Sequence, residues 1–161
     1  MRHKRLYDRA ISNLEIAIET DSTFPVPYSL MGEIKLLIKK YPEAIEQYKI
    51  ATNLDSEFVA AWSGLGQSFL MNNQLDSAEI CLNTALSLDE NFAPALISLN
   101  IIMRETERVD SAIQILSNAM ELNPKDPVLY YYMGEAYLKK QDTISAILQM
   151  KKALELYFPD K

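Results

Sequence analysis

Two residue types that often do chemistry occur only once each in this chain. His3 is the single histidine and Cys81 the single cysteine among 161 residues. A nucleophile needs a base beside it, and a zinc site needs three or four ligands, mostly histidine and cysteine. The composition therefore argues against histidine-activated nucleophiles and histidine-rich metal sites. Cys81 stands between apolar positions of a predicted helix, so we interpret it as a small buried residue.

Paired carboxylates and closely spaced glycines are the other candidates for chemistry. Asp89 and Glu90, and Glu105 and Glu107, could in principle act as acid and base, but we interpret them as solvated charges. Gly64 and Gly66 lie inside a predicted helix rather than at the strand-to-helix turn that cradles a phosphate. We predict no catalytic residue, no cofactor and no metal site.

Charge and hydropathy limit the kinds of partner expected for this chain. The net charge is −6, and Lys and Arg cluster only in the first five residues. We interpret that basic start as a solvated terminus, so nucleic acid is not an expected partner. No apolar run approaches the roughly 20 residues of a membrane span, and no apolar segment follows the basic start as in a secretory signal. A lone cysteine forms no internal disulfide, so we expect a cytoplasmic protein.

Alanines repeat along the chain at a constant interval of 34 residues. Ten of the fifteen alanines fall in two columns, with a column of bulkier residues between them. The members are Ala10, Ala44, Ala78, Ala112 and Ala146, then Leu14, Tyr48, Leu82, Leu116 and Met150, then Ala17, Ala51, Ala85, Ala119 and Ala153. Steps of four and three residues put all three columns on one face of a helix.

The intervening segments carry a second set of columns. Its clearest copy reads Trp62-x-x-Leu65-Gly66-x-x-Phe69, followed by Ala78-x-x-x-Leu82. This pattern resembles the tetratricopeptide repeat, a helix-turn-helix unit of 34 residues. The resemblance covers essentially the whole chain as a half repeat at 7–24 and four full repeats at 25–58, 59–92, 93–126 and 127–160. It implies an all-α, right-handed superhelical solenoid of antiparallel helix pairs, which we take as a single domain over 1–161.

Each predicted repeat has a first helix, at about 26–39, 60–73, 94–107 and 128–141, and a second helix, at about 42–54, 76–88, 110–122 and 144–157. We expect Gly32, Gly66 and Gly134 to permit close packing of the two helices against Ala44, Ala78 and Ala146. Gly64 is expected nearer the concave side, where it leaves room for a ligand. Asn100 replaces the glycine in the third full repeat, so that pair should splay slightly or hydrogen-bond locally. A first helix at about 7–20 precedes the full repeats.

The resemblance implies that the first helices line a concave groove in which extended peptides or partner helices lie. Transferred to this chain, the groove comprises Ser29, Glu33, Leu37, Ser63, Gln67, Leu70, Met71, Ile97, Ile101, Arg104, Tyr131, Glu135 and Leu138. Many of these residues are apolar, so we expect a protein or peptide partner with apolar anchors. Family members that grip a terminal carboxylate use Lys and Asn at positions where this chain has Ser29, Glu33 and Gly64, so we expect no such clamp.

Three functions fit these features. We favour a non-catalytic scaffold for protein interactions. The alternatives are a secretion chaperone, which similar small repeat proteins can be, and a regulatory or targeting segment of a larger chain, which could be enzymatic. The array ends also leave apolar residues uncovered, namely Ile11, Leu14, Ile18, Ile147, Leu148 and Leu154. Because solenoids normally need polar caps, we expect either end-to-end self-association or continuation in a longer chain.

Overall fold

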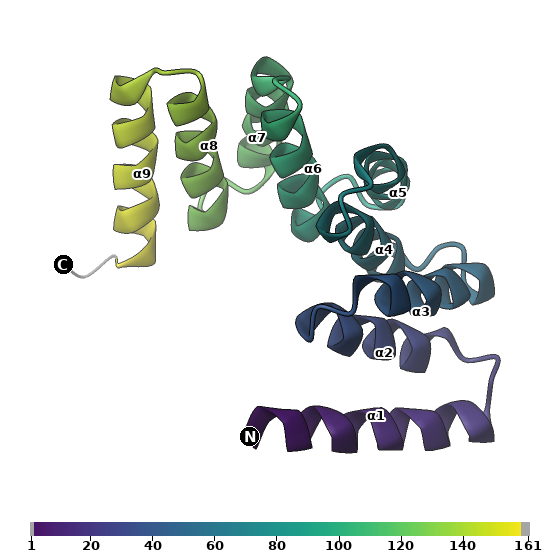
Figure 1. Cartoon of the computed structure of the whole chain (residues 1–161). Helices are drawn as coiled ribbons and strands as arrows, with labels where there is room; N and C mark the ends of the chain where they lie inside the picture. The colour runs from purple at the N-terminus through teal and green to yellow at the C-terminus, as the bar shows by residue number, and fades with distance from the viewer. Residues whose placement is uncertain (1, 159–161) are drawn as a thin grey trace. The chain divides into compact units, whose positions relative to one another are not determined.

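The structure is a computed structural model that describes residues 2–158, and the side chains of residues 6–158. The side chains of the basic start, His3 included, lie outside the described residues. All regular structure in the described part is α-helical (Figure 1). The chain divides into two compact units, Met1–Glu90 and Asn91–Lys161. The prediction that 1–161 forms a single domain therefore stays a prediction, and each unit is described by itself.

The first unit contains α1 (Arg2–Thr20) and two helix pairs. These pairs are α2 (Pro25–Leu37) with α3 (Tyr41–Leu54), and α4 (Val59–Met71) with α5 (Leu75–Leu88). The second unit contains α6 (Ala93–Glu105) with α7 (Val109–Leu122), and α8 (Pro127–Lys139) with α9 (Thr143–Tyr157). Within each unit every helix packs against the next one along the chain. Helix α1 begins at Arg2, about five residues earlier than the sequence predicts.

The first helix of each pair ends two residues earlier than predicted, and the reason is a repeated turn. Lys39, Asn73, Glu107 and Gln141 have φ between 58° and 63°, the left-handed conformation that ends a helix. After α2, the amide of Lys40 donates to the carbonyl of Lys35 at 2.8 Å, and the amide of Lys39 donates to Leu36 at 3.0 Å. These two bonds form a Schellman motif, which satisfies the last carbonyls of the helix. The equivalent of the Lys40–Lys35 hydrogen bond recurs at 34-residue steps after α4, α6 and α8.

The alanine columns lie at the centre of the helix pairs. Ala44, Ala51, Ala78, Ala85 and Ala112 are 0% exposed. A methyl group at these positions lets neighbouring helices approach closely, while the residue between the two alanines fills the space beside them. In the second unit Leu116, which stands between two alanines of α7, is also completely buried.

Glycine is required where a first helix meets the second helix of its own pair. A Cβ added to Gly66 would lie 2.6 Å from Cγ of Leu82 and 3.2 Å from the carbonyl oxygen of Ala78. One added to Gly134 would lie 2.6 Å from Cγ of Met150. The expected close packing at these two glycines is therefore present, and the bulky column contributes to it as much as the alanines.

Asn100 occupies the glycine position in the third full repeat. Its side chain is completely buried, and Nδ2 donates to the carbonyl of Ala112 at 3.5 Å. The expected local hydrogen bond is thus found. The other end of the amide, Oδ1, is buried with no partner among the described residues.

An aromatic residue ties three of the four first helices, α2, α4 and α8, to the turn before them, and α6 has Leu96 at this position. The Trp62 indole donates to the carbonyl of Ser56 at 2.9 Å, and the Tyr130 hydroxyl donates to Pro124 at 3.0 Å. The Tyr28 hydroxyl likewise donates to the carbonyl of Ser22, six residues earlier, at 3.3 Å. These side chains bury a ring and also satisfy a carbonyl of the connecting turn, which explains why aromatic residues recur at this position.

Candidate functional site

The single cysteine lies in an apolar, buried setting. Cys81 is 6% exposed, and burial raises the pKa of its thiol to about 11. At neutral pH the sulfur is therefore a thiol rather than the nucleophilic thiolate. Among the described residues, no group of three His, Cys, Asp or Glu side chains could hold a metal ion. In the same part of the chain no helix is both long and apolar enough to cross a membrane.

The space beside Gly64 belongs to the core and not to a ligand. A Cβ on Gly64 would overlap the Tyr48 ring, which reaches α4 from α3 of the preceding repeat. Tyr48 is 5% exposed, and burial raises the pKa of its hydroxyl. The opposite edge of the same ring contacts Gly32, at 2.8 Å from the position of an added Cβ. The expectation that Gly64 leaves room for a ligand is therefore wrong, because two glycines enclose one tyrosine ring.

The first unit carries part of the predicted groove on α2 and α4, which pack against each other. Leu37 is 59% exposed and Met71 is 51% exposed, and Glu33 and Gln67 are exposed beside them. Ser29 and Leu70 are half-buried. We name the set Ser29, Glu33, Leu37, Gln67, Leu70 and Met71 the α2–α4 face.

Ser63 does not belong to this face. Its side chain is only 4% exposed, so it offers almost no surface to a partner. Ser98, one repeat later, is equally buried and donates to the carbonyl of Pro94 at 2.9 Å. The family geometry placed Ser63 in the groove, but small residues at this position fit between the helices instead.

The second unit carries the remaining predicted residues on α6 and α8. We name the set Ile97, Ile101, Arg104, Tyr131, Glu135 and Leu138 the α6–α8 face. Tyr131 is 47% exposed and Leu138 is 46% exposed, whereas Ile97 and Ile101 are half-buried. The ring of Tyr131 meets that of Tyr132 edge to face, with centroids 5.3 Å apart. Such a pair holds both rings in place and keeps one of them open to a partner.

The charged residues of the α6–α8 face bind each other. Nη1 of Arg104 lies 2.9 Å from Oε2 of Glu135, and both side chains are less than one-third exposed. The Glu135 carboxylate also raises the pKa of the Tyr131 hydroxyl, first through its charge and then through a hydrogen bond. Arg104 and Glu135 therefore position Tyr131 on this face, and neither is a free charge for a ligand.

An apolar hollow that the sequence analysis did not include lies between α8 and α9. It has a volume of about 500 Å³. Its lining residues are Val128, Tyr131, Tyr132, Met150, Ala153, Leu154, Tyr157 and Phe158. On α9 itself, Ile147 is 62% exposed, Leu148 64% and Leu154 61%. The uncovered apolar residues predicted near the end of the array were a signal for this hollow, but its aromatic lining was missed.

Comparison with known proteins agrees with this architecture. A family model described as TPR repeat matches residues 32–73, and one described as tetratricopeptide repeat matches residues 59–92. The crystal structure of MamA is 25% identical, with a TM-score of 0.81 over 98% of this chain and 92% of that one. Residues 32–92 therefore match tetratricopeptide repeat models, and the chain shares the fold of proteins of that family. Its fold is an all-α solenoid of antiparallel helix pairs.

Further tetratricopeptide repeat (TPR) proteins share this fold at lower identity. TTC0263, a thermophilic TPR protein from Thermus thermophilus, is 20% identical, with a TM-score of 0.82 over 96% of this chain and 84% of that one. YrrB, described as a TPR protein with an unusual peptide-binding site, is 23% identical, with a TM-score of 0.72 over 99% and 81% of the two chains. No curated protein matches the sequence. The repeat matches and the shared fold support a role in protein interaction.

Proposed function

We propose that this chain is a non-catalytic scaffold that binds a peptide or partner helix on the first helices of its repeats. Each unit offers a surface of its own, the α2–α4 face in the first unit and the α6–α8 face in the second. The partner contributes apolar side chains, because Leu37 and Met71 on the first face and Tyr131 and Leu138 on the second are large, exposed and apolar.

One observation carries the proposal. The large apolar side chains that are exposed on first helices in the described part are Leu30, Leu37, Met71, Tyr131 and Leu138. Four of them, Leu37, Met71, Tyr131 and Leu138, belong to the groove that the family resemblance implies. When a partner covers water-exposed apolar groups, the complex is stabilised by about 25 cal/mol per Å² of apolar surface buried. YrrB, which has the same fold, offers a precedent for peptide binding.

A secretion chaperone and a regulatory segment of a larger protein remain the alternatives. Both would use the same surface, so they differ in partner and not in mechanism. A chaperone would bind unfolded segments of its client, whereas a regulatory segment would act on a domain attached to it.

The test is to select peptides from a displayed library on the immobilised protein and to titrate the best binder in solution. We expect Met71→Ala together with Tyr131→Ala to weaken binding by about 2 kcal/mol, roughly thirtyfold, because exposed aromatic anchors often dominate such surfaces. Amidation of the peptide's C-terminus should have little effect, because these faces contain no carboxylate clamp. Affinity should fall only weakly from low to moderate salt.

The matched control is Leu54→Ala together with Leu122→Ala. These leucines are 40% and 54% exposed but lie on the second helices α3 and α7. The control variant should bind the peptide as the wild type does. Binding that requires a free carboxylate, that is lost with salt, or that survives the Met71 and Tyr131 substitutions would contradict the proposal.

A further inference from the structure

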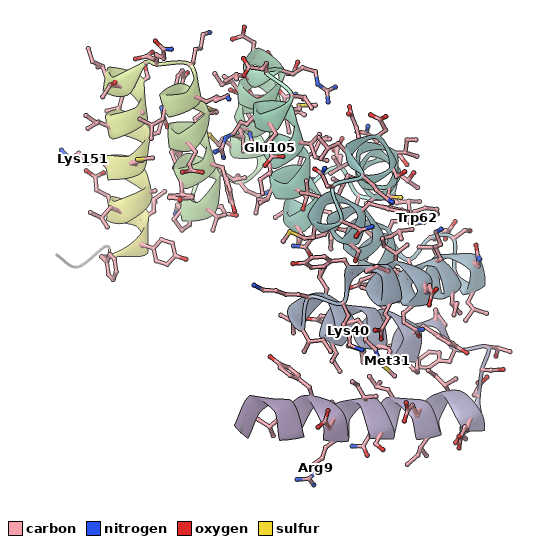
Figure 2. All side chains as sticks on the ribbon, in the orientation of Figure 1. Arg9, Met31, Lys40, Trp62, Glu105 and Lys151 are labelled. Carbon is pink, nitrogen blue, oxygen red and sulfur yellow. The ribbon has the colours of Figure 1, made fainter. Side chains whose placement is uncertain are left out.

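The hydroxyl of Tyr48 reaches the contact between two first helices without a hydrogen bond of its own. The ring begins beside Gly32 of α2 and ends beside Gly64 of α4, where Oη lies 2.7 Å from the position of an added Cβ. Met31 and Trp62 mark these two helices in Figure 2. Tyr48 is 5% exposed, and among the described residues its hydroxyl has no hydrogen-bond partner. Because a buried tyrosine hydroxyl usually has a partner, this one is open to a ligand.

Packing alone does not require a hydroxyl at this core position. One and two repeats later the position holds Leu82 and Leu116, which are both completely buried. Gly64 is also particular to its repeat, because the residue 34 positions later is Ser98. The only tyrosine of the bulky column thus occurs together with the glycine that makes room for its hydroxyl end.

Polar residues of the α2–α4 face lie beside the two glycines that hold the Tyr48 ring. Glu33 directly follows Gly32, and Gln67 stands one turn after Gly64. Burial raises the pKa of the Tyr48 hydroxyl, and the charge of Glu33 raises it further. The hydroxyl therefore keeps its proton at neutral pH, and it lies at the floor of this face near a carboxylate.

Glu33 stands among apolar side chains that a partner would cover. Leu30 and Leu37, one turn before and after it on α2, are 44% and 59% exposed. Glu33 is the only charged residue of the α2–α4 face, and in the described part of the chain it forms no ion pair or hydrogen bond. A partner that covers the two leucines also removes water from this carboxylate, which costs free energy unless a positive charge pairs with it. An amide side chain could donate to the carboxylate but would leave its charge uncompensated.

We propose that Glu33 and Tyr48 bind a lysine or arginine side chain of the partner that occupies the α2–α4 face. The basic group donates to the Glu33 carboxylate and to the Tyr48 oxygen, while its apolar stem lies along Leu30 and Leu37. This inference rests on the proposed function and adds the chemistry of one partner residue, a basic residue flanked by apolar anchors. A single ion pair on an apolar surface agrees with a weak dependence on salt.

The test begins with a displayed library of random peptides selected on the whole protein. The peptides used are those that Met71→Ala weakens, because Met71 belongs to the α2–α4 face. They should share one lysine or arginine near apolar residues, and replacing it with methionine should weaken binding about tenfold. Glu33→Gln should weaken the basic peptide by a similar factor and leave the methionine peptide nearly unchanged. Glu46→Gln, which changes an exposed carboxylate on α3, is the matched control and should have no effect.

Tyr48→Phe tests the hydroxyl, because it keeps the ring in the core. This variant should bind the basic peptide about threefold more weakly. Its urea midpoint should stay the same or rise, because no hydrogen bond within the protein is lost. A lower midpoint, or unchanged affinity for the peptide, would show that the hydroxyl does not serve a ligand and would overturn its assignment.

The outcomes separate this inference from the proposed function. Peptides that bind the α2–α4 face without a basic residue, that carry asparagine or glutamine in its place, or that tolerate Glu33→Gln would overturn the inference and leave the proposed function intact. Selected peptides that only Tyr131→Ala weakens would do the same, because the α2–α4 face would then have no partner. If neither Met71→Ala nor Tyr131→Ala weakens any selected peptide, the proposed function itself fails and the inference fails with it.

Discussion

At the scale of single residues, one tyrosine explains two glycines in different helices. Tyr48 projects from α3 between α2 and α4, and its ring occupies the space that a side chain at Gly32 or Gly64 would need. An interior glycine costs about 1 kcal/mol relative to alanine in a helix. Contacts of the buried ring with its neighbours offset that cost, and they join one repeat to the next.

Gly64→Ala should therefore lower the free energy of unfolding, by up to about 2 kcal/mol after the gain in helix propensity. Overpacking typically costs about 1–3 kcal/mol, which exceeds the gain of about 1 kcal/mol in helix propensity. Urea unfolding measures the change. In a background of Tyr48→Ala the same substitution should become neutral or stabilising, because the ring is gone. An equal effect in both backgrounds would show that the ring does not require the glycine.

At the scale of elements, the left-handed residue after each first helix sets where the helix ends. None of the four residues is glycine, although glycine adopts this conformation without steric cost. Gln141 has φ of 63° and an exposed side chain, so a substitution there acts mainly through the backbone conformation of this residue. Asn73 is the best tolerated of the four, because asparagine visits this region more readily than other residues with a side chain.

Gln141→Gly should raise the free energy of unfolding by about 0.5–1 kcal/mol, since a left-handed residue with a side chain costs about 1–2 kcal/mol and glycine flexibility in the unfolded chain returns part of it. Thermal or urea unfolding provides the measurement. Gln114→Gly, an exposed glutamine inside α7, is the matched control and should lower stability by about 1 kcal/mol. Two changes of the same sign would contradict the assigned role of the turn.

At the scale of the whole molecule, the contacts gather into two units. In repeat proteins the effect of a substitution is carried mainly by neighbouring elements. Ala112 in α7 is 0% exposed, so a larger side chain there would have to displace its packed neighbours. Ala112→Leu should cost about 1–3 kcal/mol, and the loss should be concentrated in the second unit.

Native-state amide hydrogen exchange can locate that loss. In Ala112→Leu the amides of α6 to α9 should exchange faster, while those of α1 to α3 change little. Ala78→Leu in α5 is the reciprocal control and should affect α3 to α5 most. Uniform acceleration across the chain in both variants would show that the two units unfold as one.

Much of the fold could be predicted from the sequence because its signals are local and periodic. Alanine columns at steps of 34 residues, such as Ala44, Ala78 and Ala112, place helices and identify their inner faces. The aromatic and glycine columns give the pairing of first and second helices. These patterns follow from 3.6 residues per turn and from the need to bury one face, so they need no knowledge of distant contacts.

Only the tertiary structure decided features that depend on which side chain fills which space. The sequence shows a glycine at position 64, and this glycine would look the same whether a ligand or the Tyr48 ring lay beside it. Ser63 is buried because neighbouring helices close over it, and the residues that end the first helices differ in type from Lys39 to Gln141. The apolar hollow between α8 and α9 likewise needs the tertiary structure, because residues of both helices line it. Side chains far apart in sequence meet there, and periodicity along the chain does not record what they meet.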